Sequence, residues 1–237
     1  MELKARSNSF LNGIIFAISY FSVLPLRLKK FEVDDKFYRG VIYGLPFTGA
    51  LLALVSIFGF LVLNLFFPSL YSAFLISIMY LFLYGFLHLE AVADTIDGWY
   101  ASYSGKNIYE IMKEPQIGAV GAIATFCIVL IKVAVLTYLF YLEAYLGIFI
   151  ALIFSRFSLY FILELDIHEK SSFLVSMKKV KKNLYLVDIF LFPLKLIVLK
   201  IIKRIQKRIG FINGDTTGFT IEVVEIILLH LILIIIL

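Results

Sequence analysis

Apolar residues occur along this chain in long runs, separated by short polar or basic stretches. The longest run, residues 40–89, contains no Asp, Glu, Lys or Arg. A helix that crosses a membrane needs about 20 apolar residues. This run therefore predicts two crossings, with the turn between them near Asn64 and Pro68. Further runs predict crossings at 117–142, 145–163 and 217–237, and the run at 9–26 predicts either a short crossing or an interfacial helix.

Residues 184–199 interrupt this regular pattern. They are apolar but short, Lys195 divides them, and a strongly basic stretch follows at 200–208. If they crossed the bilayer, basic loops would lie on both sides of the membrane, against the positive-inside rule. We therefore expect an interfacial or re-entrant element here. The loops at 27–39, 98–117, 164–183 and 203–216 then share one side, which we expect to be the cytoplasm.

These runs predict an all-α fold, a polytopic transmembrane bundle of about six to seven membrane helices. Composition strengthens this prediction, because 62% of the 237 residues are hydrophobic and 16% are charged. A soluble domain carries about 45–50% apolar and about 25% charged residues. With no internal repeat or low-complexity tract, residues 1–237 are expected to form a single membrane domain.

The net charge of +5 has two readings. Basic loops are typical of membrane topology, and they also attract anionic substrates or lipid headgroups. Nucleic acid binding is not expected, because the basic stretches lack interleaved stacking aromatics. The single cysteine, Cys127, excludes a disulfide and a cysteine-based metal site. No cleavable signal peptide is evident at the first apolar run.

Three acidic residues close the longest apolar run. Glu90, Asp94 and Asp97 are spaced i, i+4 and i+7, which places Asp94 and Asp97 within about 40° of Glu90 around a helix. Three carboxylates on one face repel each other unless a cation lies between them. Oxygen ligands of this kind favour Mg²⁺ or Mn²⁺. The alternative is that the acids end the span and remain solvated at the interface.

The same segment has the form D-x-x-D-G, ending at Gly98. Paired carboxylates with a divalent ion are typical of phosphoryl transfer, where the metal neutralises phosphate charge. A glycine after the second acid lets a substrate or another backbone segment approach closely. His88 lies about 200° around the helix from Glu90, so we expect it to face a neighbouring helix instead of the same ion.

Other charged residues leave alternatives open. Lys132 and Arg156 lie inside predicted spans, where they either snorkel to the interface, form helix–helix ion pairs or contact a diphosphate. The loop with Glu110 and Lys113 is either a solvated loop or a cover over a bound nucleotide. Asp215, after Gly214, is a helix cap, a metal ligand or a general base, and the motif alone favours the cap.

Together these segments resemble the cobalamin synthase family, the adenosylcobinamide-GDP ribazoletransferases. The family signature H-L-D-G-L-A-D-T-x-D-G is similar to residues 88–98, and its E-I-M-K-D-x-x-I-G block is similar to 110–118. Its late T-G-D-T-x-G block is similar to 213–218. The family also has counterparts of Leu24-Pro25, Lys132 and Ser155-Arg156. This chain departs from the family pattern at Glu90, Ala91, Glu114 and Asn213.

The resemblance implies transfer of the cobinamide phosphate of adenosylcobinamide-GDP to α-ribazole or its 5′-phosphate, with release of GMP. It implies an Mg²⁺-dependent enzyme in a prokaryotic inner membrane. Metal ligands are then expected at Glu90, Asp94 and Asp97, and catalytic groups at Asp215, Lys113 and Arg156. Expected substrate-binding residues are His88, Gly98, Glu110, Lys132 and Gly214.

Two alternative functions are weaker. The D-x-x-D-G core with Ala101 is also similar to the CDP-alcohol phosphatidyltransferase signature, D-x-x-D-G-x-x-A-R. However, Ser102 replaces the arginine of that signature, and its continuation G-x-x-x-D-x-x-x-D is missing here. A cation-coupled transporter would also use membrane acids. Transporters, however, commonly show paired inverted halves, and this chain has a single acidic block.

Overall fold

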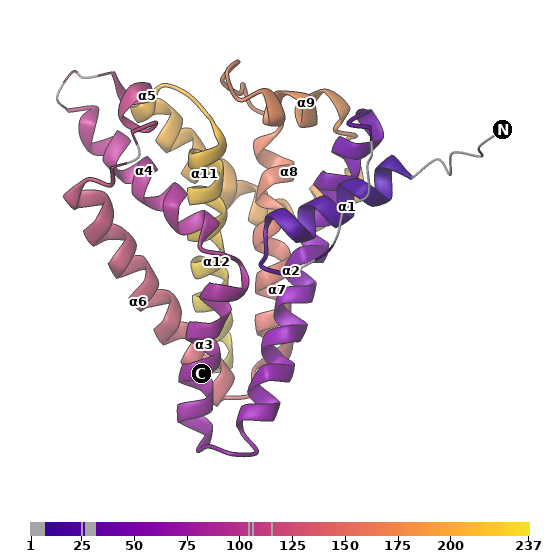
Figure 1. Ribbon diagram of the computed structural model, residues 1–237, viewed down its shortest axis with the longest axis vertical. Coiled ribbons are helices and arrows are strands. Elements are labelled where there is room, and N and C mark those ends of the chain that lie inside the picture. Colours follow the sequence, from indigo (N-terminus) through magenta and orange to yellow (C-terminus); the bar gives the residue numbers. More distant parts are fainter. Residues whose placement is uncertain (1–7, 25, 27–31, 104, 106, 115) are drawn as a thin grey trace.

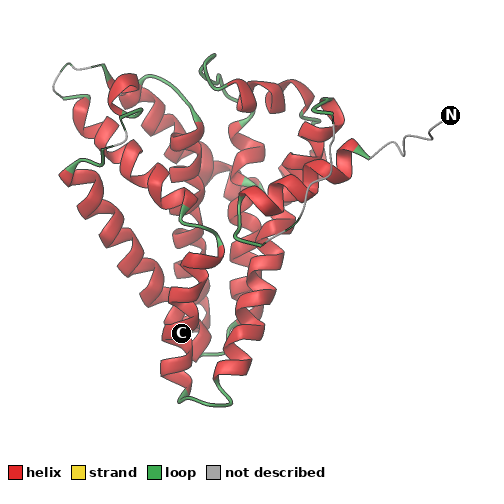
Figure 2. Ribbon diagram, in the orientation of Figure 1, coloured by secondary structure: helices red, strands yellow, loops and turns green. Residues whose placement is uncertain are grey.

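A computed structural model describes residues 8–24, 26, 32–103, 105, 107–114 and 116–237. The described residues form helices and connecting loops, with no strand among them (Figure 2). The predicted basic loop at 27–39 lies partly outside the described residues. In chain order the helices are α1 (Ser9–Tyr20), α2 (Asp35–Leu63), α3 (Ser69–Leu83), α4 (Leu87–Ala101), α5 (Ile108–Ile111), α6 (Ala119–Tyr141), α7 (Tyr145–Arg156), α8 (Ser158–Ile162), α9 (Ser172–Val180), α10 (Tyr185–Phe190), α11 (Phe192–Ile209) and α12 (Gly214–Ile236).

Four described helical stretches are long and apolar enough to cross a membrane: α2, α6, α12 and the combined α7–α8 stretch. The pair α3–α4 makes a fifth if its two helices form one broken span. The polytopic helical fold is thus confirmed, with fewer candidate spans than the six to seven predicted. One reason is that α1 has 12 residues, which at 1.5 Å per residue covers about 18 Å of a hydrocarbon core about 30 Å thick.

A sharp bend separates the apolar run from the acidic segment. The axes of α3 and α4 differ in direction by 77°. Gly85 and Phe86 both have left-handed backbone conformations, with φ of 69° and 57°, and this ends α3 because a right-handed helix cannot continue through them. Glu90, Asp94 and Asp97 consequently lie on a separate helix, α4, and do not form the tail of a straight span.

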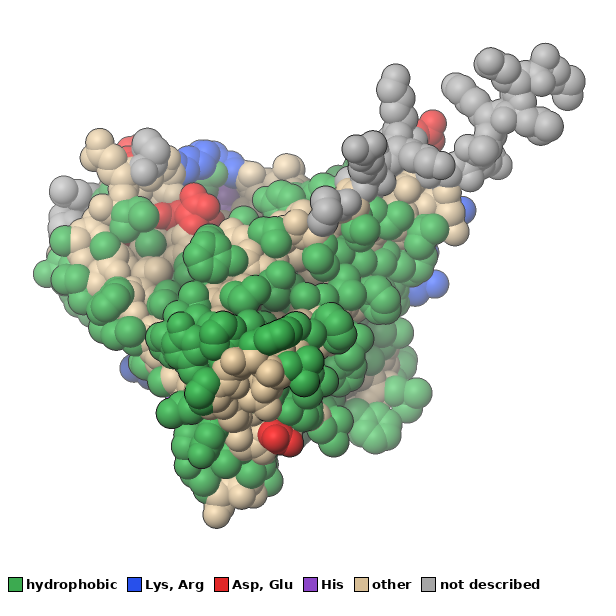
Figure 3. All heavy atoms as spheres, turned by 60° about the horizontal axis from the view of Figure 1, so that its bottom comes forward, with side chains coloured by type: hydrophobic (Ala, Val, Ile, Leu, Met, Phe, Trp, Pro, Cys, Tyr) green, Lys and Arg blue, Asp and Glu red, His purple; other side chains and the backbone are tan. Residues whose placement is uncertain are grey.

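The polar loops gather at one end of the bundle. In Figure 1, α5, α9 and the ends of α4 and α11 lie at the top, whereas the α2–α3 and α6–α7 turns lie at the bottom. Figure 3 shows the lower face covered mainly by hydrophobic side chains. The predicted common end of the polar loops is therefore seen in the described residues, and its cytoplasmic orientation remains a prediction.

Helices α10 and α11 are not among the candidate spans. One face of α11 is apolar and packs against α8, α12 and α4, while its other face is basic. At its start, Lys195 forms ion pairs with Asp188 and Glu164, at 2.8 Å to each. This two-faced pattern explains why residues 184–209 do not cross the bundle as a plain apolar helix. The buried residues of the apolar face are Leu194, Val198, Ile202, Ile205 and Ile209.

Helix α1 lies against α2 through a glycine contact. A Cβ atom on Gly13 would lie 2.9 Å from the Cα of Gly40, and one on Gly40 would lie 3.0 Å from the Cα of Gly13. Because neither residue has a side chain, the two backbones approach closely. This contact fixes α1 beside the upper part of α2, where the aromatic side chains of α1 form one wall of a cavity.

Candidate active site

A cavity of about 630 Å³ lies between α1, α4, α9 and α12. Glu90 and His88 of α4 line it, and Gly214 and Asp215 contribute from the start of α12. The opposite wall is aromatic, with Phe16, Tyr20, Phe21 and Phe173. The cavity therefore combines a carboxylate-bearing side with an apolar side, a composition that suits a large organic ligand carrying charged groups.

The start of α12 is held by Asn213, the residue before it. The Asn213 side-chain oxygen accepts a hydrogen bond from the Thr216 N–H at 2.9 Å, and the Thr216 hydroxyl accepts one from the Asn213 N–H at 2.9 Å. This is a reciprocal capping box. The favoured reading of Asp215 as the cap was wrong, because Asn213 satisfies the helix terminus first. The Asp215 carboxylate instead lines the cavity and accepts a 2.8 Å hydrogen bond from the Asn213 amide.

A second cavity, of about 550 Å³, contains the other two acids of the stripe, Asp94 and Asp97. The carboxylate of Asp94 interacts electrostatically with those of Asp215, Glu90 and Asp97. The four acids thus form one negative region that joins α4 to the start of α12. None of them forms an ion pair with a lysine or arginine in the described part of the chain.

Asp97 also has a structural contact. Its two carboxylate oxygens accept hydrogen bonds from the backbone N–H groups of Gly118 and Gly121, at 2.7 and 2.8 Å. These are unpaired N–H groups at the first turn of α6, where a negative charge is favourable. Asp97 therefore fixes α6 to α4. Each carboxylate oxygen has a second lone pair, so Asp97 can still coordinate a metal ion while it makes these contacts.

Among the described residues, no three His, Cys, Asp or Glu side chains are already close enough to enclose a metal ion. Glu90, Asp94 and Asp97 therefore lie on one helix, as predicted, but their carboxylates are not yet close enough to coordinate one metal ion together. The donor chemistry nevertheless fits a hard divalent cation, because the four acids offer carboxylate oxygens and pair with no cationic side chain among the described residues. Mg²⁺ also keeps several water ligands, so it needs few protein oxygens.

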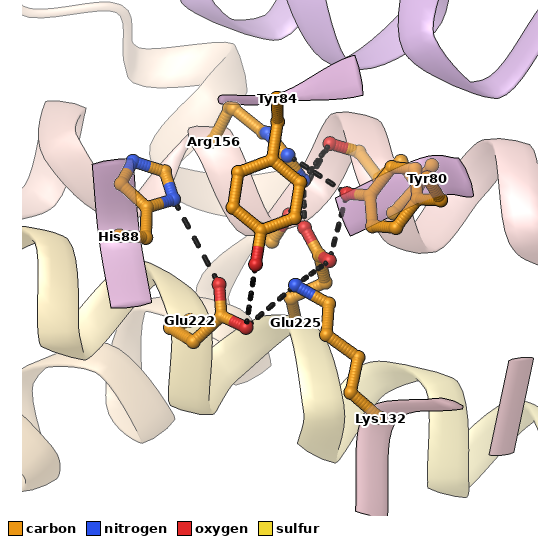
Figure 4. Close-up of polar contacts among 9 residues, drawn as sticks. Tyr80, Tyr84, His88, Lys132, Arg156, Glu222 and Glu225 are labelled. Carbon is orange, nitrogen blue, oxygen red and sulfur yellow. Dashed lines mark hydrogen bonds and ion pairs between the residues drawn. The ribbon is translucent and has the colours of Figure 1, made fainter. Parts of the chain in front are cut away.

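A separate buried network lies deeper in the bundle (Figure 4). The Lys132 ammonium, from α6, is 2.6 Å from Glu222 and 2.6 Å from Glu225, both on α12. The Arg156 guanidinium, from α7, pairs with Glu225 and donates a 3.0 Å hydrogen bond to the Tyr80 hydroxyl. Two cations meet two carboxylates, so the network is neutral overall, which reduces the cost of burying each charge.

Residues 13–233 match the family model of cobalamin-5-phosphate synthase. The chain belongs to the cobalamin-5-phosphate synthase family. A relative in Treponema denticola, named adenosylcobinamide-GDP ribazoletransferase, is 28% identical, and the aligned region covers 92% of this chain and 96% of the relative's chain.

Two further relatives with the same name show similar coverage. The Acinetobacter baumannii protein is 27% identical over 90% of this chain and 93% of its own. The Caldanaerobacter subterraneus protein is 26% identical over 92% of this chain and 96% of its own. No solved structure matches significantly. The resemblance noted in the sequence is confirmed, and the phospholipid synthase and transporter alternatives receive no support.

For this family member, the structure separates the expected site residues into two groups. Glu90, Asp94, Asp97 and Asp215 come together as expected, with Gly214 beside them. Lys132 and Arg156 line neither carboxylate-bearing cavity. The ion-pair alternative describes these two cations, because their charges are already neutralised by α12. The roles assigned to them, substrate binding and catalysis, therefore have no geometric support.

His88 faces a neighbouring helix, as predicted. Its Nδ1 atom is 3.9 Å from a Glu222 carboxylate oxygen, and neither of these buried atoms has a hydrogen-bond partner among the described residues. The His88 ring also lines the larger cavity. It thus stands between the cavity and the buried network, which keeps a substrate contact available to it.

Gly98 differs from expectation. It is buried, and a Cβ atom there would lie 2.8 Å from the Met112 side chain. The absence of a side chain at Gly98 therefore allows the 108–112 segment to pack on α4, and its role in substrate binding stays a prediction. Glu110 and Lys113 are exposed on the loop beside it. The Lys113 ammonium lies over the Tyr109 ring at 4.5 Å, and that of Lys170, which lines the larger cavity, lies over the same ring at 4.7 Å.

Sequence reasoning missed several of these residues. Glu222 and Glu225 are two carboxylates spaced i, i+3 inside an apolar span, and charges at such positions are rare enough to signal buried partners. That signal was present in the sequence. The hydroxyl groups of Tyr80 and Tyr84 donate hydrogen bonds to Glu225 and Glu222. These tyrosines carried no such signal, because an aromatic residue in a membrane helix is common. Lys170 belonged to a basic loop whose position against α4 and α12 depends on the tertiary fold.

Proposed function

We propose that this protein transfers the cobinamide phosphate of adenosylcobinamide-GDP to α-ribazole or its 5′-phosphate and releases GMP. Membership of the cobalamin-5-phosphate synthase family supports this activity. The observation that locates the activity is the convergence of four carboxylates on the cavities at α4 and α12. None of these carboxylates pairs with a cation in the part of the chain that the structure describes. The product is adenosylcobalamin or its phosphate, and the site would face the cytoplasm of a prokaryotic cell.

We propose Mg²⁺ as the cofactor, held by Glu90, Asp94 and Asp97, with Asp215 as an additional ligand or as the base. When bound, the ion would neutralise charge on the diphosphate and orient it. The support for this assignment is the donor set itself, since the four acids have no cationic partner among the described residues and their carboxylates repel one another when ionised.

The protein's own residues would bind and orient the two substrates. The aromatic wall of Phe16, Tyr20 and Phe21 would pack against apolar parts of the cobinamide or ribazole. Asp215, at the cavity surface, would accept the proton of the attacking ribose hydroxyl. Lys113 and Lys170, which converge on Tyr109, would stabilise negative charge on the phosphate that is transferred.

The test is GMP release by purified protein in lipid, with adenosylcobinamide-GDP and α-ribazole as substrates. Asp94→Asn and Asp215→Asn should each lower the rate by about 100-fold or more, because they remove a charged or proton-accepting group at the reacting centre. Glu143→Gln, at the opposite end of the bundle, is the matched control and should keep the wild-type rate. Near wild-type release by both aspartate variants would refute the site, and turnover of CDP-diacylglycerol instead would refute the function.

A further inference from the structure

A third cavity, of about 620 Å³, lies between the end of α4 and the basic face of α11. Trp99 and Tyr103 line it from the α4 side. We propose that this cavity binds the guanosine nucleotide end of the donor, which becomes GMP, by stacking the base and pairing its phosphate with α11. The inference rests on the proposed function and adds a substrate subsite to it. The basic lining residues are Lys200, Lys203, Arg204, Lys207 and Arg208.

The charge of this cavity calls for an anion. All five of its basic residues come from one helix face, and none forms an ion pair within the described residues. Elsewhere on the same helix, Lys195 is paired with two carboxylates. The Arg208 Nε atom is buried and lacks a hydrogen-bond partner in the described part of the chain. Unpaired cations that share one cavity repel each other, and a phosphate group relieves that repulsion.

The aromatic residues favour a nucleotide as the anion. The Arg208 guanidinium lies over the Tyr103 ring at 3.6 Å, and Trp99 lines the same cavity. Flat rings beside cations are the combination that holds nucleotide bases and their phosphates together. The volume is within the range of sites that enclose a ligand of this size.

The position of the cavity connects it to the carboxylate site. Tyr103 lines both this cavity and the one that contains Asp94 and Asp97. Trp99 follows Asp97 by two residues on α4. A diphosphate at the carboxylates would therefore have its cobinamide side toward the 630 Å³ cavity and its nucleotide side toward α11. The basic helix also supplies positive charge that the acidic stripe lacks, which would keep an anionic donor from being repelled.

Because Trp99 is the single tryptophan of the chain, its fluorescence can report nucleotide binding in this cavity. GDP is titrated into purified protein in phosphatidylcholine nanodiscs, and Trp99 fluorescence is recorded. We expect saturable quenching. Because each charged hydrogen bond to phosphate is worth roughly tenfold in affinity, Arg204→Gln with Lys207→Gln should weaken GDP binding by about tenfold or more. Lys179→Gln with Lys182→Gln is the matched control, since it removes the same charge from another exposed basic segment and should leave the affinity unchanged.

Two further readouts separate the outcomes. In wild-type protein the GDP affinity should fall as salt increases, a test that requires no variant to fold. In the transferase assay, the Arg204/Lys207 double variant should raise the KM for the donor by a similar factor, with kcat within about threefold and the KM for α-ribazole unchanged. Absent quenching, or equal GDP affinity in the double variant and wild type, overturns the proposal.

Anionic lipid headgroups share the phosphate chemistry and are tested as the competing ligand. If phosphatidylglycerol nanodiscs abolish the GDP response, and that effect requires Arg204 and Lys207, the cavity is a lipid site and the proposal fails. Failure of the proposed function is distinguishable. In that case GDP quenches Trp99 and the double variant weakens it, but the wild-type protein releases no GMP from adenosylcobinamide-GDP.

Discussion

Replacing Lys132 with Met should destabilise the fold strongly without removing a substrate contact. The Lys132 ammonium is fully buried and lies 2.6 Å from both Glu222 and Glu225. At an effective dielectric constant of about 20, each contact corresponds to a gross attraction of about 6 kcal/mol. Burial of the charges offsets most of this attraction, so the pair itself is worth far less.

The cost of the substitution arises from what remains. Without Lys132, two carboxylates are left with one cation, Arg156, in a site that excludes water. Removing one partner of a buried ion pair costs about 3–5 kcal/mol. For a chain of this length, 1 kcal/mol shifts Tm by about 2–4 °C. Lys132→Met should therefore lower Tm by on the order of 10 °C, measured by thermal unfolding in detergent.

A second variant makes the reasoning refutable. Lys132→Met combined with Glu222→Gln removes one charge of each sign, leaving Arg156 with Glu225, so most of the lost stability should return. The double variant should also keep the wild-type KM for both substrates. A Tm of the single variant within about 3 °C of wild type, or a double variant no more stable than the single one, would show that the network is not balanced as described. A raised donor KM in a stable double variant would restore the substrate-binding role of Lys132.

Three further predictions concern the supports of the site. Gly121→Ala should lower the free energy of unfolding by about 1–3 kcal/mol, because the new Cβ would lie 2.7 Å from the Ala93 carbonyl oxygen. Gly214→Ala is the control, since a Cβ at Gly214 would have no atom within 4 Å. Equal Tm values for the two variants would contradict the close packing of α6 on α4. Asn213→Ala should lower the free energy of unfolding by about 1 kcal/mol through loss of the helix cap, which a lower Tm would show. Asn213→Ser should keep most of the wild-type stability, because serine can also cap the helix. Removal of divalent ions with EDTA should stop GMP release and Mg²⁺ should restore it, and undiminished turnover in EDTA would exclude the proposed cofactor.

Much of the helical organisation could be predicted from hydropathy. The predicted turn near Asn64 and Pro68 separates α2 from α3, and the predicted span at 117–142 corresponds to α6. These elements were accessible because the length of an apolar run and a local break are properties of the sequence itself. The i, i+4, i+7 spacing likewise placed three acids on one helix, since helical periodicity is local.

The bend before the acidic segment was not predictable in the same way. Residues 40–89 contain no charge that would mark the end of a helix at Leu83. The break depends on left-handed conformations at Gly85 and Phe86, and a phenylalanine adopts that conformation only when surrounding packing imposes it. Asp97 presents a similar case. Its hydrogen bonds to the start of α6 join groups 21 and 24 residues away, so local spacing contains no trace of them.

The presence of a charge does not by itself distinguish structural from substrate-binding residues. The presence or absence of an ion-pair partner within the protein does. From the sequence, Arg156 fits an ion pair between helices as well as it fits a contact with a diphosphate, and in the structure its guanidinium is paired with Glu225. The acids of α4 and Arg204 on α11 have the opposite status, since they lie on cavities and lack ion-pair partners within the described residues. A group already neutralised by the protein has little electrostatic energy left for a ligand, whereas an unpaired group gains it on binding. On the proposed function, the acidic stripe and the basic face of α11 would bind a metal-diphosphate, and the buried network would hold the helices that position them.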